Sequence, residues 1–131
     1  MVGIKRTSLS IGAIIREILL KDKAVRERTK KIFPVAIDKA ILPYILYRRV
    51  GLEHNPTKAG QPGADTVLVE VVCYTANYTE GVELAEAVRA ALDYQQGEKE
   101  GLVMRSCQFS GGEEGWDDDA FAQQLDFIIK V

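Results

Sequence analysis

The segment from residue 66 to 76 shows the clearest alternation of side chains in the sequence, a pattern typical of a strand. Successive residues of a strand point to opposite faces. One face of this segment is entirely apolar and carries Val67, Val69, Val71 and Cys73. The other face combines one charge with three large apolar groups and carries Leu68, Glu70, Val72 and Tyr74. A sheet face that meets only water normally alternates more cleanly. The first face is therefore predicted to lie in the core and the second to form a contact surface.

Two segments have the spacing of amphipathic helices, with apolar residues three and four positions apart. The first begins near Ile11, and Ser8 or Ser10 is placed to cap it. Its apolar face consists of Ile11, Ile14, Ile15, Ile18 and Leu19. The second follows the strand at 66–76, is predicted to be capped by Thr79 or Glu80, and ends in a polar turn at Gly97. Its apolar stripe consists of Leu84, Ala85, Val88, Ala91 and Leu92.

Shorter patterns predict the remaining strands and loops. Residues 32–37 include Pro34, which cannot donate a ladder hydrogen bond, so this segment is predicted to be an edge strand. Further strands are expected at 44–52, 102–109 and 121–131, where apolar and aromatic residues suit a pleated surface. Turn residues predict exposed loops, and these span 54–65 and 110–119.

The order of these elements predicts the fold class. Adjacent strands joined by loops usually pair as antiparallel neighbours, and helices with one apolar stripe can lie together on one sheet face. We expect an α+β two-layer sandwich, with a mainly antiparallel sheet of four to five strands and two helices packed on one face. Residues 1–131 are expected to form a single domain, since a chain of this length buries roughly two-thirds of its unfolded surface.

Composition restricts function without identifying it. The net charge of -2 gives no general attraction for nucleic acid or anionic lipid. The N-terminus has no signal-peptide pattern, and no stretch approaches the roughly 20 apolar residues of a membrane span. Cys73 and Cys107 lie in strand-like segments and are predicted to be buried, reduced thiols.

Candidate chemistry is sparse, and no enzyme activity, cofactor or metal is expected. The single histidine, His54, falls in a predicted loop without a local carboxylate partner, whereas a general base needs a fixed geometry. The acidic cluster at 113–119 lacks the ligand spacing of a calcium loop. The sequence contains no P-loop, nucleophile elbow or C-x-x-C pair. A small metal-dependent hydrolase using His54 and the 113–119 carboxylates remains the alternative from the enzyme class.

Surface residues suggest where partners bind. Clustered basic residues at 21–31, including Arg26 and Arg28, could meet phosphate or an acidic protein face. A binding module for nucleic acid or protein, acting through Arg26, Arg28, Lys30 and Lys31, is therefore a second alternative. Trp116 is a candidate anchor because tryptophan is enriched at interface hot spots. The full candidate interface comprises Tyr47, Arg49, Leu68, Glu70, Val72, Tyr74, Arg26, Arg28 and Trp116.

Two segments resemble the tail-completion (tail-terminator) proteins of long-tailed bacteriophages and prophages. They read LPYILYRRVG at 42–51 and VLVEVVCYTANYTEGVELAEAVRAALD at 67–93. The resemblance implies a virion structural protein that forms a homo-oligomeric ring, a hexamer in many relatives. Such a ring lies at the head-proximal end of the tail, binds the tail-tube protein and the head-tail connector, and assembles in the host cytoplasm. The resemblance implies neither a membrane nor a specific nucleic acid as partner.

Overall fold

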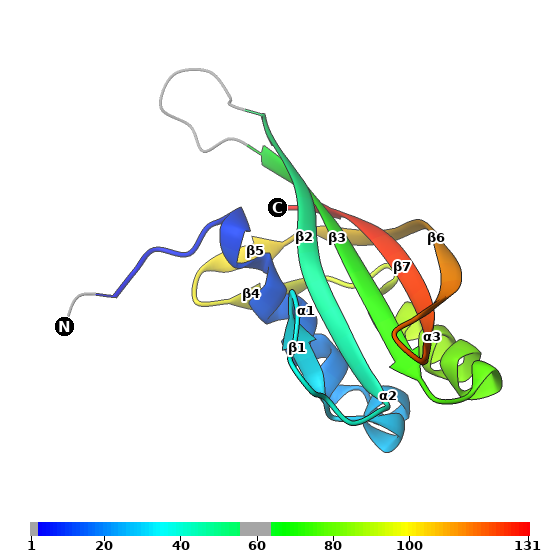
Figure 1. Ribbon diagram of the computed structural model, residues 1–131. Helices are drawn as coiled ribbons and strands as arrows, with labels where there is room; N and C mark the ends of the chain where they lie inside the picture. The colour runs from blue at the N-terminus through cyan, green and yellow to red at the C-terminus, as the bar shows by residue number, and fades with distance from the viewer. Residues whose placement is uncertain (1–2, 56–63) are drawn as a thin grey trace, which may run out of the picture.

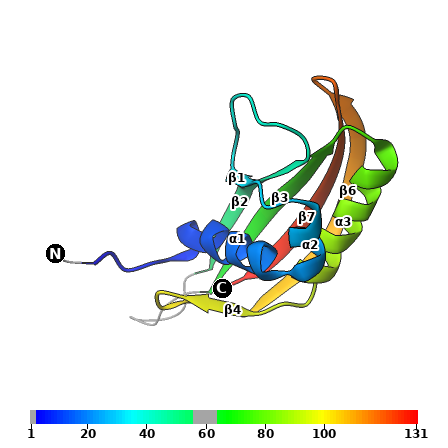
Figure 2. The same cartoon turned by 90° about the horizontal axis from the view of Figure 1, so that it is seen from below.

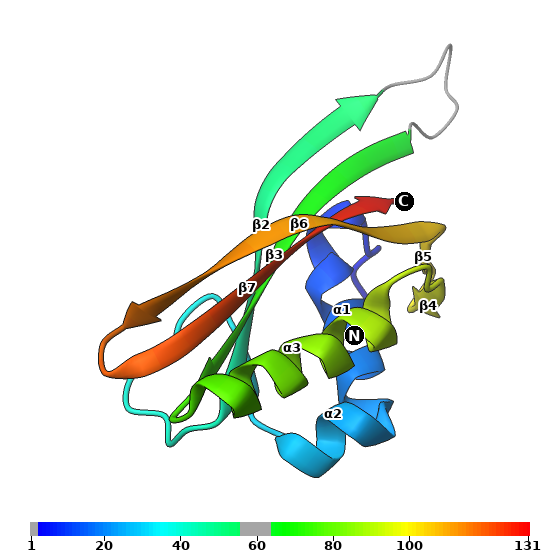
Figure 3. The same cartoon turned by 90° about the vertical axis from the view of Figure 1, so that its right-hand side faces the viewer.

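A five-stranded sheet carries the α-helices on one face in the computed structural model, which describes residues 3–55 and 64–131 (Figures 1 and 3). The strands follow the order β1-β2-β3-β7-β6 across the sheet. They are β1 (Ile32–Pro34), β2 (Tyr44–Asn55), β3 (Ala64–Thr75), β7 (Ala120–Lys130) and β6 (Ser106–Asp117). The helices are α1 (Ile11–Lys21), α2 (Lys23–Arg28) and α3 (Tyr78–Leu92).

The α+β class is confirmed, and the sheet is mixed because β1 runs parallel to β2. The other pairings in this sheet are antiparallel. The basic segment that follows α1 forms the short helix α2, so three helices rather than two lie on the covered face. A separate two-stranded sheet is formed by β4 (Gly97–Lys99) and β5 (Leu102–Met104). In Figure 2, α1 lies over the β1–β2 half of the sheet and α3 over the β7–β6 half.

The core forms between the helices and the face of β3 that was predicted to be buried. Ile11, Ile14, Ile15 and Leu19 of α1 are buried, as are Leu84, Val88 and Leu92 of α3. They pack in one cluster with Val67, Val69, Val71 and Cys73. Full burial of one such aliphatic side chain stabilises the fold by roughly 1.5–3 kcal/mol. The predicted apolar stripes are therefore confirmed.

The predicted cap of α3 is wrong, and that of α1 is right in position but not in its hydrogen bond. Asn77 caps α3, where its side chain accepts a hydrogen bond from the backbone N–H of Glu80 at 3.2 Å. Ser10 occupies the N-cap position of α1 but makes no capping hydrogen bond with its side chain. Asn, Thr and Ser are all good caps, so the choice depends on where β3 ends. That end lies at Thr75, which leaves only two residues before α3.

The prediction of a loop at 110–119 is also wrong, because β6 continues through this segment to Asp117. The register with β7 shifts by one residue between Phe109 and Gly111, as at a β-bulge, and the pairing continues beyond it. The strand predicted at 102–109 divides into β5 and the start of β6, and Gly97 begins β4 rather than ending a helix. Within the loop predicted at 54–65, residues 54–55 belong to β2 and 64–65 to β3, and residues 56–63 lie outside the described residues.

Candidate functional site

The outer face of the sheet, opposite the helices, brings four predicted interface residues together on β3. Leu68, Glu70, Val72 and Tyr74 alternate with the core residues; Leu68 is 42% exposed, Glu70 and Tyr74 are half-buried, and Val72 is only 9% exposed. Register places Tyr44 and Leu46 of β2 beside Tyr74 and Val72. The rings of Tyr44 and Tyr74 stack with centroids 5.0 Å apart. Among the described residues, no helix covers this face, which carries Leu68 and the Tyr44–Tyr74 pair together with the charged Arg48 and Glu70.

The charges on the outer face come from pairs across the strands. Arg48 of β2 lies 3.5 Å from the Glu70 carboxylate. Partial burial raises the pKa of Tyr74, and the negative charge of Asp117 raises it further. Burial and then the charges of Asp118 and Asp117 likewise raise the pKa of Tyr44. The acidic end of the β6–β7 hairpin therefore lies close enough to act electrostatically on this aromatic pair.

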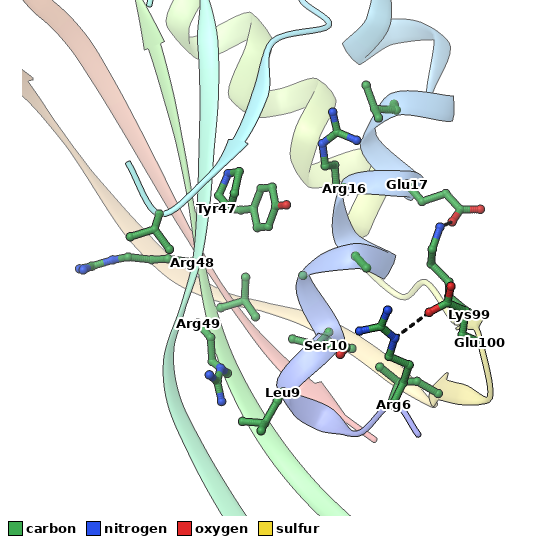
Figure 4. A pocket seen from close by; sticks show the side chains of 18 of the residues that line it. Arg6, Leu9, Ser10, Arg16, Glu17, Tyr47, Arg48, Arg49, Lys99 and Glu100 are labelled. Carbon is green, nitrogen blue, oxygen red and sulfur yellow. Dashed lines mark hydrogen bonds and ion pairs between the residues drawn. The ribbon is translucent and has the colours of Figure 1, made fainter. Parts of the chain in front are cut away.

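Tyr47 and Arg49 lie on the opposite face, because register pairs them with the core-facing Val71 and Val69. They line a groove between α1 and β2 with a volume of about 810 Å³ (Figure 4). Tyr47 is 9% exposed and forms the floor beside Gly12 of α1. Arg49 extends from β2 along the open side, whereas Arg48 points away from the groove. The predicted interface residues of β2 and β3 thus divide between two faces.

The groove is strongly basic, and its charges are only partly balanced. Glu17 of α1 pairs with Lys21 at 2.6 Å and Lys99 at 2.8 Å. Glu100 pairs with Arg6 at 2.7 Å. The lysine hydrogen bonds and charges, that of Lys21 foremost, lower the pKa of Glu17 to about 2.

Two arginines of the groove have no such partner. The Arg16 Nε group donates to the carbonyl oxygen of Ile32 at 3.1 Å. Within residues 3–55 and 64–131, no carboxylate oxygen lies within 4.0 Å of Arg16 or Arg49. Their charges are available to an acidic ligand.

Trp116 lies at the other edge of the sheet, near the end of the β6–β7 hairpin. Its indole is 59% exposed and packs edge-on against Phe121, with ring centroids 4.7 Å apart. Tyr78 packs against the same Phe121 ring at 5.9 Å and donates a hydrogen bond to Glu114 at 2.8 Å. We call residues 113–119 the acidic hairpin end; its carboxylates belong to Glu113, Glu114, Asp117, Asp118 and Asp119.

Arg26 and Arg28 lie on α2, which packs against α1 and α3, and join neither the outer face nor the groove lining. Arg28 donates to the Ala24 carbonyl oxygen at 3.0 Å and lies 3.9 Å from Glu83 of α3. These contacts stay within the helical layer. Arg26 is exposed on the surface of the same short helix.

His54 has a carboxylate partner, contrary to the prediction of an isolated loop histidine. Its Nδ1 atom lies 2.6 Å from Oδ1 of Asp65 across the β2–β3 hairpin. Ser8 donates to the other carboxylate oxygen of Asp65, and these hydrogen bonds lower the pKa of that carboxyl. In a catalytic triad the histidine must bond the nucleophilic hydroxyl. Here Asp65 bonds both groups, so the arrangement fastens the N-terminal segment to the hairpin.

Other candidate chemistry finds little support in the described part of the chain. No three His, Cys, Asp or Glu residues there converge as metal ligands would. Cys73 and Cys107 are buried, unbonded thiols as predicted, and burial raises the pKa of Cys107 to about 12. No described helix has both the length and the hydropathy to traverse a bilayer.

The distribution of charge along the sequence is a signal that the small net charge conceals. Residues 1–50 contain twelve lysines and arginines against four carboxylates. Residues 106–129 contain six carboxylates and no lysine or arginine. Such asymmetry between parts of one chain can be read from the order of residues alone. It predicts a basic N-terminal region and an acidic segment near the C-terminus, although not the groove itself.

These features define an α+β protein with a helix-free outer sheet face, a basic groove and no assembled catalytic centre among the described residues. The sequence profile of the family described as tail completion protein gp17 matches residues 13–131, and the chain belongs to that family. Family membership makes it a phage tail structural protein. In a solved structure of the virion of a native gene transfer agent (GTA) particle, one chain shares the fold, with a TM-score of 0.69 and 15% sequence identity. The match covers 95% of this chain and 96% of the other. No curated protein matches it in sequence.

Proposed function

We infer that the protein is one subunit of a ring that caps the tail tube at its head-proximal end and docks the capsid connector. Family membership supports a place in the tail, and the outer face supports contact with another component of the assembly. In that face, Leu68 and the partly exposed Tyr44–Tyr74 stack form an apolar patch without a helix over it, whereas Val72 beside them is only 9% exposed. Such patches mark protein interaction sites when polar groups surround them, and here Arg48 and Glu70 do so.

The uncovered apolar patch is the observation that carries this proposal. A ring requires two different surfaces on each subunit, because a head-to-tail contact closes only when its rotation closes. The two faces and two edges of the sheet present different chemistry, as such a contact needs. The proposed partners are further copies of this chain, the tail-tube protein and the connector. Assembly in the host cytoplasm precedes incorporation into the virion.

A solution experiment tests the ring and the patch together. The purified protein, alone and mixed with tail-tube protein, is expected to form a closed oligomer of one size by light scattering and to decorate tube ends in electron micrographs. Leu68→Ser should lower the assembled fraction. Val103→Ser is the matched control, since Val103 is 46% exposed on β5 but lies away from the outer face. A protein that stays monomeric at high concentration with tube protein present would contradict the proposal.

A genetic experiment tests the role in the tail. Deletion of the gene in a phage that depends on it should yield overgrown tail tubes without heads, because nothing stops polymerisation or joins the connector. Tails of normal length attached to heads would rule out this role even if the purified protein formed rings.

A further inference from the structure

The two edges of the sheet carry opposite charge. The groove lies at the β1–β2 edge and is lined by Arg16 and Arg49, whose charges no nearby carboxylate balances in the described parts of the chain. The acidic hairpin end belongs to β6 and β7, at the far edge of the strand order. Repulsion among five carboxylates at 113–119 and attraction to a basic partner both favour a contact between these surfaces. Within one chain the two surfaces do not pair: none of the carboxylates at 113–119 forms an ion pair with Arg16 or Arg49, and four strand spacings separate β1 from β6.

The groove also has an apolar lining and lies beside a stretch of β2 that is unpaired on one side in the described part of the chain. Its lining includes the ring of Tyr47 and the side chains of Leu9 and Leu20. Beside it, β1 pairs with β2 only as far as Tyr47, and the N–H of Val35 closes this pairing on the Tyr47 carbonyl. In the described residues no strand pairs with β2 on that side from Arg48 onward. An aromatic side chain flanked by carboxylates suits such a basic groove with an apolar lining.

The acidic hairpin end presents that combination. Trp116 is exposed, held edge-on by Phe121, and flanked by Asp117 and Glu114. The packing against Phe121 restricts the indole before any partner binds, which lowers the entropy cost of docking. Strand β6 is also the last strand of the sheet, so this corner projects from the edge (Figure 3).

We propose that the acidic hairpin end of one copy docks into the groove of the next copy, with Trp116 over Tyr47 and the carboxylates on Arg16 and Arg49. This contact is heterologous, so it propagates from copy to copy around a ring. The inference rests on the proposed function and identifies its lateral interface. Nucleic acid is the weaker occupant, because the acidic hairpin end and the net charge of -2 oppose binding to a polyanion.

Charge reversal provides the test. A groove variant carries Arg16→Glu and Arg49→Glu, and a hairpin variant carries Asp117→Lys and Asp118→Lys. Each alone should assemble more than about tenfold more weakly than the wild type, because like charges then face each other. Mixed in equal amounts, the two variants should assemble again, since each reversed surface now matches its neighbour. The mixed rings should alternate strictly, which native mass spectrometry detects as equal numbers of each variant.

Controls separate this contact from a general effect of charge. Glu86→Lys on α3 and Lys39→Glu between β1 and β2 change exposed charges outside both surfaces and should leave assembly unchanged. Circular dichroism checks that every variant is folded, which matters for Arg16 because it bonds the Ile32 carbonyl. If the groove variant fails to fold, Trp116→Ala supplies the second test, with an expected loss of assembly but not of folding.

Cross-linking tests the geometry in a protein with native charges elsewhere. In the double variant Arg49→Cys, Asp118→Cys, a short thiol cross-linker should give a ladder of covalent oligomers on a denaturing gel. The native thiols do not interfere because Cys73 and Cys107 are buried.

The outcomes distinguish the two proposals. If the wild type forms rings and both the groove variant and the hairpin variant form them equally well, the hairpin–groove contact is overturned and the proposed function stays intact. A monomeric wild type would overturn both. A gel shift with DNA that Arg49→Glu abolishes, without any loss of ring assembly, would assign the groove to nucleic acid instead.

Discussion

Gly112 of β6 lies directly against the carbonyl group of Gln124 on β7. A Cβ atom added at Gly112 would collide with the carbonyl oxygen and lie 3.0 Å from its carbon. The obstacle is backbone, which cannot move aside as a side chain can. This contact follows the bulge at residues 109–111 and keeps the outer half of β6 close to β7. The acidic hairpin end therefore depends on a glycine several residues away from Trp116.

Gly112→Ala is expected to destabilise the protein by about 2–4 kcal/mol, since overpacking costs about 1–3 kcal/mol even where neighbours yield. Gly115→Ala is the matched control on the same strand, because a Cβ there meets nothing within 4 Å. That substitution should be neutral or slightly stabilising through the unfolded chain. Urea unfolding of both variants measures the difference. Equal midpoints would show that β6 adjusts freely at this position.

The same glycines explain why the sequence predicted a loop where β6 lies. Gly111, Gly112 and Gly115 are typical turn residues when read locally. In the structure, however, Gly112 is needed because the backbone of β7 lies against it. The local sequence does not show that β7 is the neighbouring strand. The alternation in β3 and the helical stripes of α1 and α3, by contrast, are set by burial on one face. Burial of this kind is recorded in the order of residues, so these elements could be predicted.

Asn77→Ala should lower the free energy of unfolding by about 1 kcal/mol, the usual cost of losing a helix cap. The Asn77 side chain accepts from the N–H of Glu80, and without it that N–H loses its partner at the start of α3. Thr79→Ala provides the control, since Thr79 lies within the first turn and is exposed. Thermal melts compare the two. If Thr79→Ala lowered the stability more than Asn77→Ala, Thr79 would be the cap, as the sequence suggested.

Glu17 should give the protein an acid-sensitive link between α1 and β4. Hydrogen bonds and the charges of Lys21 and Lys99 lower its pKa to about 2 from 4.5, so the folded state binds fewer protons than the unfolded state between these values. The resulting stability is present above about pH 4.5 and is lost as the pH falls toward 2.

Wild type and Glu17→Gln should therefore differ in melting temperature near neutral pH and converge at about pH 2. The difference should be small, because exposed ion pairs contribute little. Glu86→Gln is the control for removing an exposed carboxylate from a helix. A constant difference across this pH range would mean that Glu17 does not act through its charge.

The candidate site was predictable in part. The outer face was predicted from the alternation along β3. Apolar residues on the face of a strand that points away from the core are not needed for folding, so they suggested a contact surface. Tyr47 and Arg49 lie on one strand as expected, but the face they occupy depends on pairing with Val71 and Val69. The groove was not visible in the sequence, since it needs α1, β2 and the residues around Lys99 in one place. The charge asymmetry between the two ends of the chain predicts a basic N-terminal region, although not the groove itself.

Cys73 and Cys107 should be unreactive while the protein is folded. Both are fully buried, and burial raises the pKa of each thiol, that of Cys107 to about 12. Because the thiolate is the nucleophile, both burial and the raised pKa suppress reaction with Ellman's reagent near neutral pH. We expect no prompt reaction in buffer and release of two equivalents on adding denaturant. An Arg49→Cys variant gives the positive control, since that side chain is exposed and should react at once. A prompt reaction of one native thiol would show that β3 or β6 opens locally, and the hairpin end would then be less fixed than the contact with Gly112 implies.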